Sequence, residues 1–168
     1  MAFALRPMGP GDADDLVRFH EGLSPETTYL RFFSPHPHLS ATEIDRFTNV
    51  DHVDRDAVVA TSAGDIIGVG RFDRLADRSV AEVAFAVAEG WHRRGVGRAL
   101  FEHLAVRARQ LGVCQFQAET LWENRAMLGL FHHVGRPVTM RSDGGVVHVE
   151  IELDQPVSAA APECTATR

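Results

Sequence analysis

The sequence of 168 residues contains only two cysteines and one tyrosine. Two cysteines cannot build the disulfide framework that stabilises small secreted domains. No apolar run approaches the roughly 20 residues that a membrane-spanning helix needs. The N-terminal stretch also lacks the basic and apolar regions of a secretory signal. These absences predict a soluble protein of the reducing cytoplasm with no membrane partner.

Basic residues are in the minority, with 17 lysines and arginines against 23 aspartates and glutamates. The formal net charge of −6 disfavours nucleic acid as a partner and is compatible with a positively charged substrate. The nine histidines show neither the H-x-x-x-H spacing nor a Cys/His spacing that is typical of metal sites. No metal site is therefore expected.

Hydrophobic spacing predicts a chain that begins mostly helical and then alternates strands with helices. Ser24 followed by Pro25, and the pair Ser40 and Glu43, are strong signals of helix starts. The predicted strands cover residues 3–7, 56–61, 65–75, 79–87, 113–121 and 145–153, and the predicted helices follow Asp12, Ser24 and Ser40 and cover 97–112 and 123–135. This order indicates a mixed sheet flanked by helices, in the α/β or α+β class. We predict one domain over residues 1–154 and a disordered tail over 155–168.

The stretch WHRRGVGRAL, residues 91–100, joins a predicted strand to a predicted helix. Backbone N–H groups at a helix start have no partner and bind anions. Gly95 and Gly97 allow close approach of a phosphate, and Arg93, Arg94 and Arg98 add charged donors. The alternative is a solvated helix start, although cations there oppose the helix dipole. We therefore favour a phosphate-bearing ligand.

The glycines fit neither the dinucleotide-binding fingerprint, whose third glycine is replaced by Leu100, nor the P-loop motif. HRRGVGRAL is instead similar to the R/Q-x-x-G-x-G/A turn of the GNAT N-acetyltransferase superfamily, which binds the pyrophosphate of acetyl-CoA. The first position of the motif is His92 rather than Arg or Gln. The element order and the later stretch ENRAMLGLF match that family over roughly residues 3–153. The resemblance implies a mixed, mostly antiparallel GNAT-like sheet and acetyl-CoA as the acyl donor.

Within the superfamily, LSPETTYLRFFSPHPHLSATEI, VDHVDRDAVVA and AEVAFAV resemble the bacterial Pat-type protein lysine acetyltransferases. Those enzymes often carry a fused regulatory domain, for which this sequence has no room, so we expect the acetyltransferase domain alone. The resemblance implies that the acceptor is the side-chain amine of a lysine in a protein substrate. Acyl-CoA synthetases are frequent targets of such enzymes.

Transfer to an amine needs a base, and Glu82 is the candidate. On a strand it shares a face with the apolar residues Val80, Ala84 and Ala86, so we expect partial desolvation. The alternative from composition is a solvated carboxylate paired with an arginine, but the resemblance implies that Glu82 is the general base. Glu119 is a second, weaker candidate, which could bind the incoming ammonium. His52 is a weak candidate for the substrate side, because a surface histidine is the more frequent case.

The resemblance also implies which residues bind acetyl-CoA. Backbone groups near the end of the strand contact the pantetheine arm and polarise the thioester, and the turn holds the pyrophosphate. The residues concerned are Phe85, Ala86, Val87, Arg93, Arg94, Gly95, Val96, Gly97 and Arg98. Asn124 is expected to cap the last helix, to contact the CoA arm, or to do both. Phe131 occupies the position where many members have a tyrosine acid, so no such acid is expected.

Two further functions stay open. One is acetylation of a small amine such as an amino acid, a polyamine or an aminoglycoside. The other is a non-catalytic module that binds acyl-CoA and regulates a partner, against which Glu82 argues. For either enzyme we expect direct attack by the amine in a ternary complex, because no nucleophilic cysteine or serine with a partner base is evident.

Overall fold

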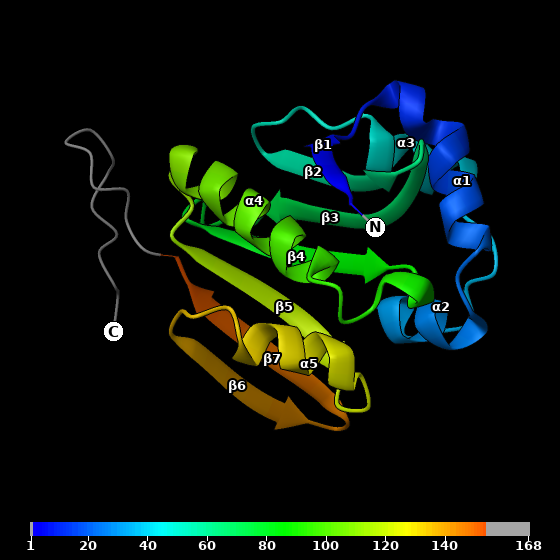
Figure 1. The fold of residues 1–168 in the computed structure, drawn as a ribbon. Helices are drawn as coiled ribbons and strands as arrows, with labels where there is room; N and C mark the ends of the chain where they lie inside the picture. Colours follow the sequence, from blue (N-terminus) through cyan, green and yellow to red (C-terminus); the bar gives the residue numbers. More distant parts are fainter. Residues whose placement is uncertain (1, 154–168) are drawn as a thin grey trace.

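One seven-stranded sheet forms the centre of the computed structural model, which describes residues 2–153 (Figure 1). The strands are β1 (Ala4–Pro7), β2 (Arg55–Ser62), β3 (Asp65–Arg74), β4 (Val80–Val87), β5 (Gln115–Leu121), β6 (Val138–Asp143) and β7 (Val146–Glu152). The α-helices are α1 (Ala13–Glu21), α2 (Pro25–Phe32), α3 (Ala41–Thr48), α4 (Val96–Gln110) and α5 (Arg125–His132). The predicted tail over 155–168 lies outside the described residues.

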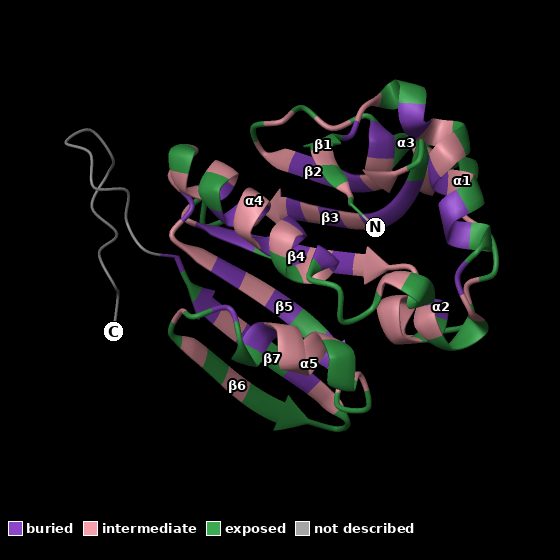
Figure 2. Ribbon diagram, viewed as in Figure 1, coloured by how far each residue is buried: buried purple, intermediate pink, exposed green. Residues whose placement is uncertain are grey.

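The strand order is β1-β2-β3-β4-β5-β7-β6, and every neighbouring pair is antiparallel except β4 and β5. The prediction of a mixed, mostly antiparallel sheet flanked by helices is therefore confirmed. The sequence analysis missed β6, which forms the edge of the sheet. Figure 2 shows that most of β6 is exposed. Only Val138 and Met140 pack against the core, and two alternating apolar residues are too few to mark a strand.

All three early helices begin directly after Asp12, Ser24 and Ser40 as predicted, and two of these residues cap their helix through the side chain. The Ser24 hydroxyl accepts a hydrogen bond from the N–H of Thr27 at 3.1 Å. Ser40 and Glu43 form the complete capping box, with bonds of 3.2 and 2.8 Å. Asp12 precedes α1, but its carboxylate does not cap that helix. It accepts instead from the Gly9 N–H at 2.8 Å and from the guanidinium of Arg6 at 2.6 Å.

Helices cover both faces of the sheet and enclose two apolar clusters. Helices α4 and α5 pack on one face, where Leu100, Leu104 and Phe131 are buried against β2–β5 and β7. Helices α1 and α3 contribute to a smaller cluster on the other face. None of the helices in residues 2–153 has the length and apolar character needed to span a membrane.

Strands β4 and β5 separate soon after they begin to pair. Their parallel register runs only from Val80 and Gln115 to Glu82 and Gln117. Beyond Glu82, β4 pairs with β3 alone, and beyond Gln117, β5 pairs with β7 alone. Figure 1 shows the two strands diverging toward the side of the molecule where α2 lies. The sheet therefore opens into a gap whose apex is at Glu82.

Candidate active site

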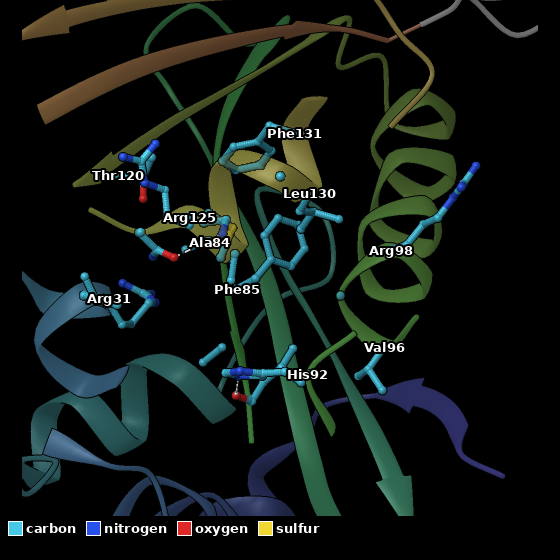
Figure 3. A pocket seen from close by; sticks show the side chains of 18 of the residues that line it. Arg31, Ala84, Phe85, His92, Val96, Arg98, Thr120, Arg125, Leu130 and Phe131 are labelled. Carbon is cyan, nitrogen blue, oxygen red and sulfur yellow. Dashed lines mark hydrogen bonds between the residues drawn. The ribbon is translucent and has the colours of Figure 1, made fainter. Parts of the chain in front are cut away.

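A cavity of about 690 Å³ occupies the gap between β4 and β5. Its walls come from both strands, from the start of α4, from α5 and from α2. Figure 3 shows Arg31 of α2, Phe85 of β4, and Leu130 and Phe131 of α5 around this space. The volume is within the range of about 300–1,000 Å³ found for small-molecule sites.

The backbone of β4 faces this gap at every second residue. The N–H of Ala88 donates to the carbonyl of Ile67 on β3 at 2.9 Å, and the register between these strands is regular. Because strand residues alternate in the direction of their backbone groups, those of Val83, Phe85 and Val87 point away from β3 and into the gap. Of the three residues predicted to polarise the thioester, Phe85 and Val87 therefore have backbone groups that point into the gap, whereas those of Ala86 point toward β3.

Helix α4 begins at the edge of the cavity, with Gly95 as its N-terminal cap. Gly95 has a φ of 82°, which glycine adopts without strain. The first intrahelical bond joins the N–H of Ala99 to the carbonyl of Gly95 at 3.0 Å. The N–H groups of Val96, Gly97 and Arg98 precede this bond, and all three residues line the cavity. The helix start therefore presents backbone donors to a ligand in the cavity.

The three arginines of the turn do not act alike. Arg93 and Arg98 line the cavity, and Arg93 has a φ of 58°, a rare conformation for a side-chain-bearing residue. Arg94 does not line the cavity. Its guanidinium lies 5.5 Å from the centre of the Trp91 ring. Of the three arginines of the turn, Arg93 and Arg98 therefore place their charge at the cavity wall.

Glu82 is exposed, so the expected desolvation is wrong. Its neighbours along the strand are small and apolar, but its neighbours across the sheet are Asp73 and Gln117, which are polar. Within residues 2–153 its carboxylate has no hydrogen bond and no ion pair, so Glu82 is solvated, as the alternative had it, but lacks the arginine partner of that alternative. Glu82 lies beside Val83 and Ala84, which line the cavity, but is not itself a lining residue. The carboxylate is therefore free to accept a proton at the apex of the gap.

The two weaker substrate candidates lie in different places. Glu119 is an exposed residue of β5 that lines the cavity, and its carboxylate is 3.0 Å from the Nδ1 atom of His148. His52 does not line the cavity. Its Nδ1 atom lies 2.7 Å from the carboxylate of Asp56, which also pairs with Arg107 of α4 at 3.2 Å. His52 is thus tied to Asp56 and, through the shared partner Arg107, to α4.

Helix α5 closes the cavity with one polar cap and one buried ring. The Asn124 side chain accepts from the N–H of Met127 at 3.1 Å, which confirms the predicted cap. Phe131 is buried, lines the cavity, and has its ring centre 6.5 Å from that of Phe85. The only tyrosine of the chain, Tyr29, lies on α2, is 39% exposed and does not line the cavity. No phenol therefore borders the site.

A model of the acetyltransferase (GNAT) family matches residues 18–135. The chain belongs to the GNAT acetyltransferase family. Over 154 residues it is 35% identical to Acetyltransferase Pat of Mycolicibacterium smegmatis, with 90% of this chain and 46% of that protein covered. This GNAT chain thus spans about half the length of that curated relative.

Solved structures agree with this assignment. The GNAT domain of S. lividans PAT is 41% identical, with a TM-score of 0.84 and 89% of each chain covered. A GNAT phosphinothricin acetyltransferase from Sinorhizobium meliloti, solved in complex with acetyl-CoA, is 18% identical with a TM-score of 0.76, over 99% of this chain and 96% of that chain, and shows the fold alone. The predicted resemblance to GNAT enzymes of the Pat type is confirmed.

Many residues that line this GNAT cavity were not predicted as site residues, and three polar ones among them are Arg31, His92 and Thr120. Arg31 reaches it from α2, and His92 lines it while its Nε2 atom lies 2.8 Å from the carbonyl of Val87. Thr120 is buried on β5, and its hydroxyl has no hydrogen-bond partner within the described part of the chain. The alternation of β5 places Thr120 inward with Ala118, a signal that the sequence did contain. No local pattern marks Arg31.

Metal ligands do not gather in this domain. Among residues 2–153 no three histidine, cysteine, aspartate or glutamate side chains lie close enough together to hold an ion.

Proposed function

We propose that this GNAT domain transfers the acetyl group of acetyl-CoA to the side-chain amine of a lysine in a protein substrate. The observation that carries the proposal is the unpaired carboxylate of Glu82 at the apex of a gap. One side of that gap presents hydrogen-bond donors that suit acetyl-CoA, the acyl donor. The sequence identity of this chain to Acetyltransferase Pat and to the S. lividans PAT domain supports a protein lysine as the acceptor.

Acetyl-CoA is the donor in this proposal. The backbone donors of Val96, Gly97 and Arg98, with the charges of Arg93 and Arg98, suit its pyrophosphate. The free backbone groups of Val83 and Phe85 suit its extended amide-containing arm, because an amide chain can pair with an open strand edge. The Sinorhizobium meliloti structure with acetyl-CoA shares this fold and supports the same donor here.

The acceptor amine must be neutral to attack. A free lysine amine has a pKa of about 10.4, so only about one in 2,500 molecules is neutral at pH 7. Glu82 takes a proton from the ammonium, directly or through one water, and the amine attacks the thioester carbonyl. The new C–N bond forms as the C–S bond breaks, and the products are an N6-acetyl-lysine, CoA and one proton.

Direct transfer within a ternary complex is favoured over a covalent enzyme intermediate. Among the described residues that line the cavity there is no cysteine or serine. Of the two threonines, Thr120 has no hydrogen-bond partner among residues 2–153, and Thr27 donates to the carboxylate of Glu89, whose pKa is lowered to about 2, so that carboxylate is a weak base. With Phe131 in the place of a phenol, the CoA thiolate leaves without a tyrosine acid. Water or the proton released by the amine then completes the thiol.

The test is the variant Glu82→Gln, which keeps the size of the side chain and removes its basicity. We expect CoA release in the presence of acceptor to fall by about 100-fold or more. The affinity for acetyl-CoA, measured by calorimetry, should stay within about twofold, because Glu82 is placed on the acceptor side. Glu119→Gln is the matched control, for which we expect a smaller loss, because His148 already pairs with that carboxylate.

Full activity of Glu82→Gln would contradict the assignment of the base. The same assay separates the other two functions. A small-amine enzyme releases CoA with metabolites but not with proteins. A regulatory module binds acetyl-CoA and releases no CoA with either.

A further inference from the structure

A second cavity, of about 50 Å³, lies on the face of the sheet that α1 and α2 cover. Backbone and side-chain atoms of residues 84–86 separate it from the large cavity, and Arg31 lines both. Arg71 of β3 lines the small cavity from the side of the sheet. Its volume suffices for one small polar group or a water molecule. Two guanidinium groups thus meet in one small space beside the acceptor end of the active site.

Most donors of these two groups have no acceptor. Arg71 reaches only Asp73, at 3.5 Å, and its guanidinium lies 4.3 Å from the centre of the Phe47 ring. Its Nε atom is buried without a hydrogen-bond partner in the described chain. The guanidinium of Arg31 lies 4.9 Å from the centre of the Phe32 ring, and residues 2–153 supply it with neither a hydrogen bond nor an ion pair.

The local charge is also unbalanced. Asp73 is shared between Arg71 and Arg46, which lies 3.6 Å away. Glu82 lies near both half-buried arginines but contacts neither. Burial, with the repulsion of Arg71, lowers the pKa of Arg31 to about 10, so this group still carries its charge at neutral pH. Two neighbouring cations out of bulk water are unfavourable unless an anion joins them.

We propose that Arg31 and Arg71 bind a carboxylate of the acceptor, next to the amine that Glu82 deprotonates. Arg71 on β3 is paired with Ala84 on β4, and Ala84 lies two residues from Glu82 on the same face of β4. The carboxylate subsite and the amine subsite therefore belong to one surface. A planar guanidinium binds a carboxylate through two parallel hydrogen bonds. The inference rests on the proposed function and specifies its substrate: an amine with a carboxylate nearby.

Two sources can supply such a carboxylate, namely an acidic residue beside the target lysine of a protein, or the α-carboxylate of a free amino acid. The probes are therefore two pairs. Two end-capped peptides contain one lysine each and differ only in having glutamates or glutamines on either side of it. L-lysine and L-lysinamide form the second pair. CoA release gives kcat/KM for each probe with the wild type, Arg31→Met and Arg31→Lys.

For the wild type we expect the glutamate peptide to exceed the glutamine peptide by about tenfold or more. In Arg31→Met the ratio should fall to about one, and in Arg31→Lys it should be intermediate. The net charge of −6 repels acidic peptides at long range, so the preference has to come from local contact. Arg18→Met is the matched control, because Arg18 is exposed on α1, pairs with Asp15 and lines neither cavity.

The outcomes separate the two proposals. A preference for L-lysine over L-lysinamide that depends on Arg31, without turnover of either peptide, supports the carboxylate site and contradicts protein acceptors. Turnover of the peptides with a ratio near one in the wild type overturns the carboxylate site and leaves the lysine acetyltransferase intact. A preference for the glutamate peptide that persists in Arg31→Met also overturns the carboxylate site. No CoA release with any probe overturns the proposed function and, with it, this inference.

Discussion

Glu89 ties the turn before α4 to the start of α2, and its replacement gives a prediction whose size follows from the structure. Its carboxylate accepts from the N–H of Ser24 at 2.9 Å and from the hydroxyl of Thr27 at 2.6 Å. It thereby caps the helix that carries Arg31. Burial acts to raise the pKa of Glu89, but these hydrogen bonds outweigh it and lower the pKa to about 2, below the ordinary 4.5.

Without solvent screening, the difference between those two pKa values corresponds to a contribution of about 3 kcal/mol to the free energy of unfolding. Glu89 is exposed, however, and solvent screening reduces the contribution of such a group to about 1 kcal/mol. The effect of losing a helix cap is of the same size, about 1 kcal/mol. Because the pKa is lowered in the folded state, this stabilisation is complete above pH 4.5 and is lost as the pH falls toward 2.

The assay is urea unfolding of the wild type and of Glu89→Gln between pH 7 and pH 3. We expect the variant to be less stable by about 1 kcal/mol at pH 7, and the two curves to converge below pH 4.5. Glu26→Gln is the control, since Glu26 is also in the first turn of α2 but has no hydrogen bond to any described residue. A difference that stays constant down to pH 3, or no difference at pH 7, would refute the reasoning.

Two further variants test the packing around the site. Thr120→Val removes a buried hydroxyl that has no partner in residues 2–153, so we expect it to raise the free energy of unfolding by about 1 kcal/mol; a loss of stability in thermal melts would contradict this. Gly68→Ala places a methyl group 3.0 Å from Val96 and 3.2 Å from Leu100, so it should destabilise the protein by about 1–3 kcal/mol and weaken acetyl-CoA binding by moving the start of α4. Gly97→Ala, whose added methyl is no closer than 3.6 Å to a neighbour, should not lower stability in the same urea titration.

The parts of the site that are local in sequence were predictable. The glycine-rich turn, the start of α4 and the cap of α5 by Asn124 each depend on a few consecutive residues, and the structure has them where the pattern indicates. Helix caps at Ser24 and Ser40 follow from the same kind of short-range signal. Such features need no knowledge of which strands pair.

The parts that depend on strand pairing were not predictable. Glu82 has apolar neighbours along its strand, but Asp73 and Gln117 flank it across the sheet, and a single sequence does not reveal that register. For the same reason the meeting of Arg31 with Arg71 left no trace in the sequence. The contacts of His52 were equally hidden, because its partner Asp56 is also bound by Arg107 of α4, which is distant in the sequence.

Isotope labelling shows whether the protein acetylates lysines of other proteins with Glu82 as the base. Isotopically labelled acetyl-CoA is incubated with the soluble proteins of the source organism and with either the wild type or Glu82→Gln. Mass spectrometry then locates labelled lysines. The account predicts labelled lysines on a small number of proteins, and their loss in Glu82→Gln. The absence of labelled protein, while a metabolite extract drives CoA release, would contradict the claim and identify a small-amine acetyltransferase.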